Sequence, residues 1–143
     1  MVLPVPVSFH ILPHRQLILF TYTGHVTLQE SMDIVAQAAA HPEYQPWMRQ
    51  LCDLSAVTGV ERDFPKLLRM QARIIEDLMP QGHDLQVLFF APTRAGQEMA
   101  HMARKSWEGL NSVMVLIQDQ EAAVLELLGL RETSLTQLHH HLA

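Results

Sequence analysis

The chain has 143 residues, which suits one domain and is enough for a hydrophobic core that needs no disulfide or metal to stabilise it. Apolar residues make up 48% and charged residues 17% of the sequence, so disordered, collagen-like and low-complexity classes are excluded. The net charge of −5 argues against a nucleic-acid-binding domain, because such domains are normally basic.

The cysteine content and the hydropathy pattern indicate in which cellular compartment the protein is found. The single cysteine, Cys52, excludes an internal disulfide and a four-cysteine metal site, and it is typical of a reducing cytoplasm. No apolar run reaches the roughly 18 residues that a membrane-spanning helix needs. Residues 1–6 are interrupted by Pro4 and Pro6 and carry no basic cluster, unlike a signal peptide. We therefore expect a cytoplasmic protein without a transmembrane segment.

Strand-like and helix-like patterns alternate along the chain. Residues 7–12 and 16–23 are two β-rich runs with a short connection, which predicts an antiparallel pair. Thr27 and Glu30 then have the spacing of a capping box, so we expect a helix to begin there and to stop before Pro42. The later predicted elements are a strand at 48–54, a helix at 63–80, a strand at 84–90, a helix at 93–110, a strand at 113–117 and a helix at 121–128 with Asp119 as its N-cap.

This order of elements, ββαβαβαβα, predicts an α/β fold. Strands separated by helices of crossover length are mostly parallel, so we expect a mixed, mostly parallel five-stranded sheet covered by helices. No linker or repeat divides the sequence, and we expect a single domain over residues 1–143 with its core at about residues 7–130. Residues 131–143 include a run of histidines and are expected to form a mobile C-terminal tail.

Ligands of such sheets usually bind beyond the carboxyl ends of the parallel strands. In this sequence that rule selects His25, Asp53, Ser55, Thr93 and Arg94 as candidate ligand-binding residues. Asp53 and Ser55 could form a small polar site, although an Asp-x-Ser sequence more often caps a turn by bonding to nearby backbone amides. Thr93 and Arg94 open a helix, where free amides and a guanidinium could hold an anion, but many helix starts share these features.

The predicted helix at 63–80 is the most amphipathic segment. Arg62, Lys66, Arg69 and Arg73 form a basic stripe on one side. This stripe could meet an acidic partner or an anionic membrane surface, but a plain solvent-exposed face is the simpler interpretation. The opposite side is expected to pack on the sheet and consists of Phe64, Leu67, Leu68, Gln71, Ile74, Ile75 and Leu78.

Several other residues have a structural interpretation beside a functional one. Trp47, close to Tyr44, could make an exposed contact at an interface or at the rim of a pocket. Cys52 lies in an apolar strand, where burial raises the pKa of a thiol and disfavours its reactivity. The methionines could line an adaptable apolar pocket, although their helical spacing also suits core packing. The histidines lack the spacing of a metal site, and we expect neither a metal nor a cofactor.

Three short segments resemble the STAS/SpoIIAA-like superfamily. They are residues 26–30 (Val-Thr-Leu-Gln-Glu), residues 51–58 (Leu-Cys-Asp-Leu-Ser-Ala-Val-Thr) and residues 119–123 (Asp-Gln-Glu-Ala-Ala). With the order of elements, the match covers roughly residues 9–130 and implies the same fold. In that superfamily, anti-sigma-factor antagonists switch partners when a kinase phosphorylates a serine in an Asp-Ser-Ser-Gly stretch. That stretch aligns with residues 61–64 (Glu-Arg-Asp-Phe), which lack the serine, so the chain is more similar to the SpoIIAA-like branch of unassigned function, part of which is grouped with lipid-binding folds.

These observations favour a non-enzymatic interaction or regulatory domain that contacts a protein partner or a second copy of itself, as a homodimer. The alternative is a carrier of a lipid or another small apolar or anionic molecule. Such a carrier would have an apolar pocket beneath the helix at 63–80 and an anion contact at Arg94. The sequence contains no Gly-x-Ser-x-Gly nucleophile motif, and we expect neither enzymatic activity nor a nucleic-acid partner.

Overall fold

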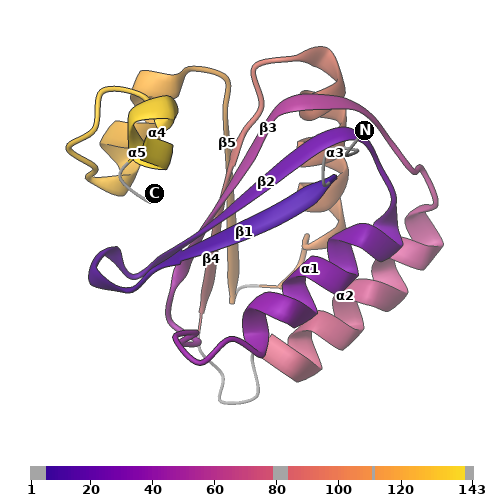
Figure 1. Ribbon diagram of the computed structural model, residues 1–143. Coiled ribbons are helices and arrows are strands. Elements are labelled where there is room, and N and C mark those ends of the chain that lie inside the picture. Colours follow the sequence, from indigo (N-terminus) through magenta and orange to yellow (C-terminus); the bar gives the residue numbers. More distant parts are fainter. Residues whose placement is uncertain (1–5, 79–83, 111, 141–143) are drawn as a thin grey trace, which may run out of the picture.

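The computed structural model describes residues 6–78, 84–110 and 112–140 and contains one sheet of five strands in the order β1-β2-β3-β4-β5 (Figure 1). β1 is antiparallel to β2, and every other neighbouring pair is parallel. The predicted α/β fold with a mixed, mostly parallel sheet is therefore confirmed. The strands are β1 (Val7–Leu12), β2 (Leu17–Val26), β3 (Arg49–Val60), β4 (Leu85–Phe90) and β5 (Val113–Gln118).

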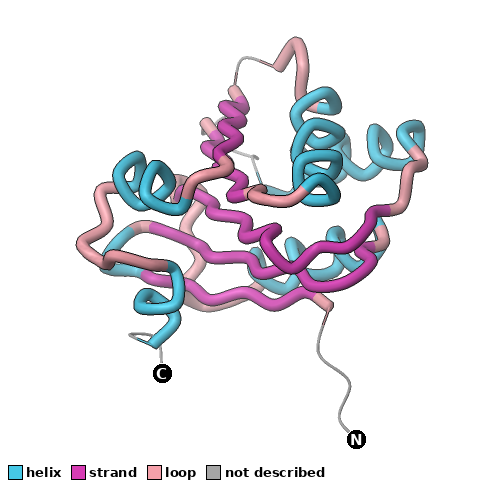
Figure 2. The backbone as a smooth tube through the Cα atoms, turned by 90° about the horizontal axis from the view of Figure 1, so that it is seen from above, coloured by secondary structure: helices cyan, strands magenta, loops and turns pink. Residues whose placement is uncertain are grey.

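Helices cover both faces of this sheet, as the two views of the backbone show (Figures 1 and 2). The helices on the first face are α1 (Leu28–Ala39), α2 (Phe64–Leu78) and α3 (Arg94–Ser106). Those on the second face are α4 (Glu121–Leu128) and α5 (Leu135–His140), and a short 3-10 helix, η1 (Pro13–Arg15), joins β1 to β2.

Alternate side chains of β2 point to opposite faces of the sheet. Ile18 and Phe20 belong to the core cluster on the first face, whereas Leu17 and Leu19 belong to the cluster under α4 and α5. All of them are fully buried. A strand that is buried on both faces has to be apolar almost throughout, which explains the continuous apolar runs in the sequence.

The N-terminal capping of α1 agrees with the sequence prediction, whereas that of α4 differs from it. Thr27 Oγ1 accepts a hydrogen bond from the backbone N–H of Glu30 (3.1 Å), and Glu30 Oε1 accepts one from the N–H of Thr27 (2.9 Å), so the predicted capping box is confirmed. The expected N-cap of α4, Asp119, is wrong. Gln120 occupies that position and makes no side-chain capping bond, and the acidic Glu121 in the first turn favours the helix start instead.

β3 continues to Val60, whereas the sequence predicted that it ends at Leu54. Its pairing with β4 stops at Asp53, but its pairing with β2 goes on, with register shifts that leave extra residues in β3. Beyond Asp53, β3 is therefore an edge strand, which tolerates polar side chains. The change to polar residues marks the point where β4 leaves β3, not the end of the strand.

The C-terminal segment forms α5 instead of the mobile tail that we expected. Leu135 is 4% exposed and Leu138 is fully buried, and both belong to the core cluster on the second face, with leucines of β1 and β2. Glu132 is also buried and forms an ion pair with Arg15 of η1. Because residues three apart lie on the same side of a helix, these two leucines give α5 an apolar side that docks on the sheet. Residues 141–143 lie outside the described part of the chain.

Replacing Leu138 by Ala is expected to lower the free energy of unfolding by about 2–5 kcal/mol, because it leaves a cavity in a closed part of the core. Urea denaturation followed by circular dichroism measures this change. The matched control is Thr136→Ala, since Thr136 is an exposed residue of the same helix. Equal stability of the two variants would contradict the packing of α5.

Candidate functional site

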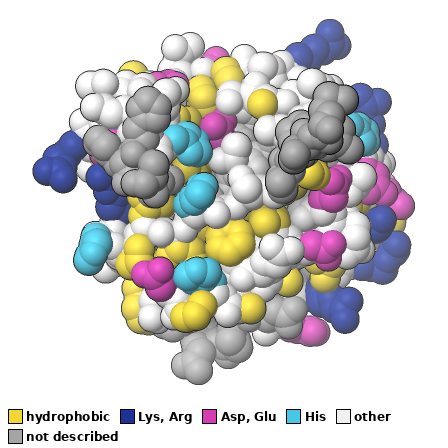
Figure 3. All heavy atoms as spheres, in the orientation of Figure 1, with side chains coloured by type: hydrophobic (Ala, Val, Ile, Leu, Met, Phe, Trp, Pro, Cys, Tyr) yellow, Lys and Arg dark blue, Asp and Glu magenta, His cyan; other side chains and the backbone are white. Residues whose placement is uncertain are grey.

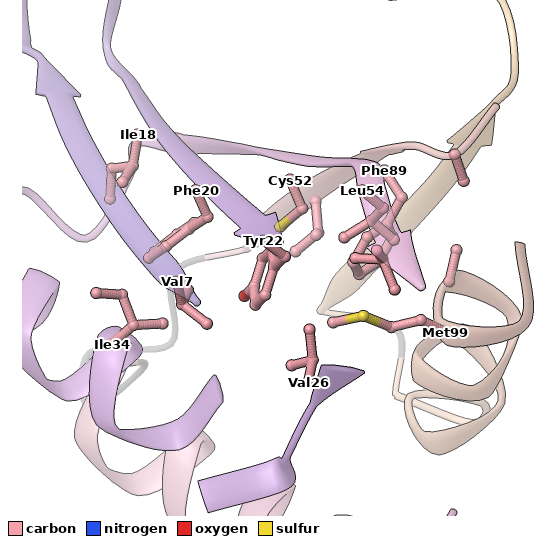
Figure 4. Packing of buried hydrophobic residues seen from close by; sticks show 14 of the residues in the cluster. Val7, Ile18, Phe20, Tyr22, Val26, Ile34, Cys52, Leu54, Phe89 and Met99 are labelled. Atoms are coloured by element: carbon pink, nitrogen blue, oxygen red, sulfur yellow. The ribbon is translucent and has the colours of Figure 1, made fainter. Parts of the chain in front are cut away.

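An apolar cavity of about 110 Å³ lies between the sheet and helices α1, α2 and α3. Figure 4 shows part of the surrounding core, in which Tyr22 of β2 and Cys52 of β3 lie close together and Met99 of α3 extends toward them. An apolar pocket beneath the second long helix is the feature that the carrier hypothesis requires. Its lining includes Tyr22, Gln50, Cys52, Val87 and Phe89 from the sheet, and Met32, Val35, Met70, Gln71, Ile74, Met99, Met102 and Ala103 from the helices.

Methionines supply much of the helical wall of this cavity. Met70 and Met99 are buried, while Met32 and Met102 are partly exposed at its outer side. Methionine has an unbranched, polarizable side chain that adapts to irregular spaces and to different ligands. The volume is similar to that of apolar cavities of about 150 Å³ that stay dry and accept benzene. The cavity can therefore take a molecule about the size of one aromatic ring.

Tyr22 and Cys52 form a neutral polar pair in the sheet wall of the cavity. Burial raises the pKa of the Cys52 thiol to about 12, the nearby charge of Asp53 acts in the same direction, and a hydrogen bond from Tyr22 opposes them. Burial also raises the pKa of Tyr22 well above its ordinary value. Both groups keep their protons at neutral pH, which agrees with the prediction that Cys52 is a core residue of low reactivity.

Gln71 of α2 is a buried polar residue in the helical wall, with a side chain that is 6% exposed. Its Nε2 donates a hydrogen bond to Ser106 Oγ of α3 (2.6 Å), and Ser106 Oγ donates to the backbone oxygen of Ala103 (2.6 Å). Gln71 Oε1 is buried and has no hydrogen-bond partner among the described residues. The helical periodicity placed Gln71 on the apolar side of this helix. A polar amide among apolar positions indicates a site residue, but the sequence analysis did not select Gln71 for that reason.

Asp53 and Ser55 bond to each other within β3. Asp53 Oδ1 accepts hydrogen bonds from the backbone N–H of Ser55 (3.0 Å) and from Ser55 Oγ (2.7 Å). These bonds lie where the pairing of β3 with β2 shifts register, so the carboxylate satisfies a backbone amide at an irregular point of the strand. This is the local capping arrangement that was weighed against a polar site, and neither residue lines the cavity.

Thr93, Arg94 and His25 lie near the carboxyl ends of the strands but away from the cavity lining. Thr93 caps α3 by accepting a hydrogen bond from the N–H of Gly96 (3.1 Å), and Arg94 is exposed in the first turn. A Cβ at Gly96 would lie 3.1 Å from the backbone oxygen of Leu54, so α3 begins in close contact with β3. The exposed His25 covers Gly59, where an added Cβ would lie 2.9 Å from the histidine Nδ1.

The basic stripe lies on the outer side of α2 and just before it. All three arginines are exposed, and Arg62 forms an ion pair with Glu98 of α3. Lys66 is partly buried and forms an ion pair with Glu61 (3.3 Å). The space-filling view shows basic side chains interspersed with acidic ones on the side of the molecule where α1 and α2 lie (Figure 3). The prediction of the buried side of α2 is partly wrong, because Leu68 is 45% exposed. Met70, which was not predicted on that side, is buried, since α2 packs against both α1 and α3.

A second apolar feature lies on the other face of the sheet. Met114 and Leu116 of β5 and Leu127 of α4 are 53%, 41% and 52% exposed, and they border a shallow hollow. We call these three residues the β5 patch. β5 pairs only with β4 in the described sheet, so one edge of its backbone is open. Trp47, which the sequence selected as an exposed contact, lies outside the hollow and is 52% exposed.

The described residues contain no group of histidine, cysteine, aspartate or glutamate side chains that could hold a metal ion. Among the helices of that same part of the chain, none combines the length and the apolar character needed to cross a membrane. His10 and His139 lie near each other, but in an edge-to-face ring contact with centroids 6.3 Å apart.

No family model matches this sequence, and no curated protein matches it. Its structure is similar to the crystal structure of an uncharacterized protein of the DUF3478 family with a SpoIIAA-like fold from Shewanella loihica PV-4. The TM-score is 0.55 at 13% sequence identity, over 90% of this chain and 98% of that chain. The chain has a SpoIIAA-like fold. The resemblance inferred from short sequence segments is confirmed at the level of the fold.

Residues 61–63 connect β3 to α2, which begins at Phe64. Glu61 Oε1 accepts a hydrogen bond from the N–H of Leu28 (2.9 Å), which is the main reason that the pKa of Glu61 lies below its usual range. Asp63 Oδ1 accepts a hydrogen bond from the N–H of Lys66 (3.0 Å) and so caps α2. The carboxylates at this position join the starts of α1 and α2.

Raising the pH is expected to destabilise the fold through Cys52. The pKa of this thiol rises from 9.0 to about 12 in the folded chain, so the unfolded chain loses the proton first. The resulting stabilisation is fully present below about pH 9 and is lost between about pH 9 and 12. Urea denaturation at a series of pH values should show a shallower decline for Cys52→Ala than for the wild type. Identical slopes would contradict this role of Cys52.

Proposed function

We propose that this protein is a non-enzymatic binding protein that holds a small, mostly apolar molecule in the cavity between the sheet and helices α1, α2 and α3. The observation that supports this function is the methionine-rich apolar cavity of about 110 Å³. Binding without chemistry suits the groups in and beside it, because Cys52 keeps its proton and Asp53 is engaged by Ser55.

The outer wall of the cavity suits entry of a ligand. Met32 and Val35 of α1 and Ile74 of α2 are only partly buried although they line the cavity. Small rotations of these side chains would open a path between the two helices. The anion contact expected at Arg94 is not part of this function, because Arg94 does not line the cavity.

Methyl NMR of protein labelled at the methionine ε-carbons tests this function. We expect toluene to shift the signals of the methionines that line the cavity, because an aromatic ring changes the shielding of methyl groups beside it. Met48, in the adjoining core cluster, and Met114, in the β5 patch, should change little. The reporters of binding are Met32, Met70, Met99 and Met102.

A cavity-filling variant provides the control for this titration. Ala103→Leu adds apolar volume to the cavity wall and should weaken toluene binding, whereas Ala122→Leu changes an exposed position of α4 and should not. The proposal is wrong if neither toluene nor hexanol shifts the lining methyl signals, or if both variants bind as the wild type does.

A second function, self-association, is supported by the β5 patch. β5 combines an open backbone edge with exposed apolar side chains, and its sequence from 113 to 118 contains no charged residue and no proline, which often protect edge strands. Antiparallel pairing of two copies about Val115 would place Met114 of each copy opposite Leu116 of the other, on the same face of the joined sheet. This is the homodimer form of the interaction hypothesis.

Leu116→Lys is expected to weaken this self-association at least about tenfold, because it places a charge at the centre of the apolar contact. Sedimentation equilibrium over a range of protein concentrations measures the effect. The control is Leu68→Lys, which changes an apolar residue of α2 with similar exposure, 45% against 41%. A wild-type chain that stays monomeric throughout, or an equal effect of both variants, would contradict association through β5.

A further inference from the structure

We infer that the ligand of this cavity is a small neutral molecule with one hydrogen-bond donor, such as an aromatic hydroxyl or ring N–H, and that Gln71 Oε1 accepts that donor. This inference rests on the function proposed above and adds the chemical class of the ligand. It also makes Gln71 the residue that determines specificity.

The unpaired oxygen of Gln71 is the first argument. The described residues contain two buried side-chain atoms without a hydrogen-bond partner, Thr21 Oγ1 and Gln71 Oε1, and of these two residues only Gln71 lines the cavity. A buried acceptor without a partner costs free energy, and native structures rarely retain one without a reason. A donor supplied by a ligand would remove that cost.

The orientation of the Gln71 amide is determined by its neighbours. The single proton of the Ser106 hydroxyl is used in the bond to the backbone oxygen of Ala103, so Ser106 can only accept from Gln71. The amide must therefore present its NH₂ group to Ser106. Oε1 is left without a partner, and exchanging it with Nε2 would cost either the bond between Gln71 and Ser106 or the bond from Ser106 to Ala103.

The rest of the lining excludes a charged ligand. No lysine, arginine, aspartate or glutamate lines the described cavity, and the Cys52 thiol beside Tyr22 is neutral. A charge placed there would lose its hydration without gaining a partner. A neutral molecule with an apolar body and one donor satisfies both the walls and Gln71.

Phenol and toluene are matched probes for this inference, because they have nearly the same shape and differ in one hydroxyl group. Their dissociation constants are measured by the methionine methyl titration for the wild type, Gln71→Met and Gln37→Met. Gln37 is the control for the substitution, since it is an exposed glutamine of α1 that does not line the cavity. We expect Gln71→Met to weaken phenol relative to toluene by about tenfold or more, and Gln37→Met to leave the ratio unchanged.

The outcomes separate the two proposals. If toluene and phenol bind but their ratio is the same in the wild type and in Gln71→Met, the role of Gln71 is wrong and the binding function stands. If neither probe binds the wild type, the binding function fails and the inference with it. Should Gln71→Met not fold, the side-chain carbonyl carbon of Gln71 is observed in the wild type. A shift with phenol that toluene does not produce supports the inference, and equal shifts overturn it.

Discussion

The central strands of this protein are apolar on both faces, and the positions of the helices follow from the need to cover them. In β2, the neighbours Leu19 and Phe20 are both fully buried although they point to opposite sides. In the described part of the chain, three helices cover the first face and two cover the second, where α5 adds Leu138 to the core. The short C-terminal helix is therefore part of the core.

The helices leave part of each face of the sheet uncovered, and each uncovered part suggests a function. On the first face, the helices leave a partly open apolar cavity lined by long, adaptable side chains. On the second face, α4 and α5 do not reach across β5, so Met114 and Leu116 remain exposed at an open edge. An internal cavity suits a small ligand, and an exposed strand edge suits another polypeptide chain.

The polar side chains in and around the core differ in how fully they are hydrogen-bonded. Asp53 receives two hydrogen bonds from Ser55, and Glu61 receives one from Leu28, so these carboxylates hold the backbone in place. Gln71, which lines the cavity, instead donates to Ser106 and keeps an unpaired oxygen. A buried polar atom left without a partner in the wall of a cavity is the physical basis for the ligand contact that we propose.

The sequence by itself determined the order of elements and the class of fold, because capping boxes such as Thr27 with Glu30, and the period of apolar residues, act over a few positions. It misjudged the end of β3 and the C-terminal segment, because both depend on partners far away in the chain. For the site, it placed Gln71 on the apolar side of its helix. Only the packing of α2 against α3 brings Ser106, 35 positions away, to the Gln71 amide and leaves Oε1 unpaired.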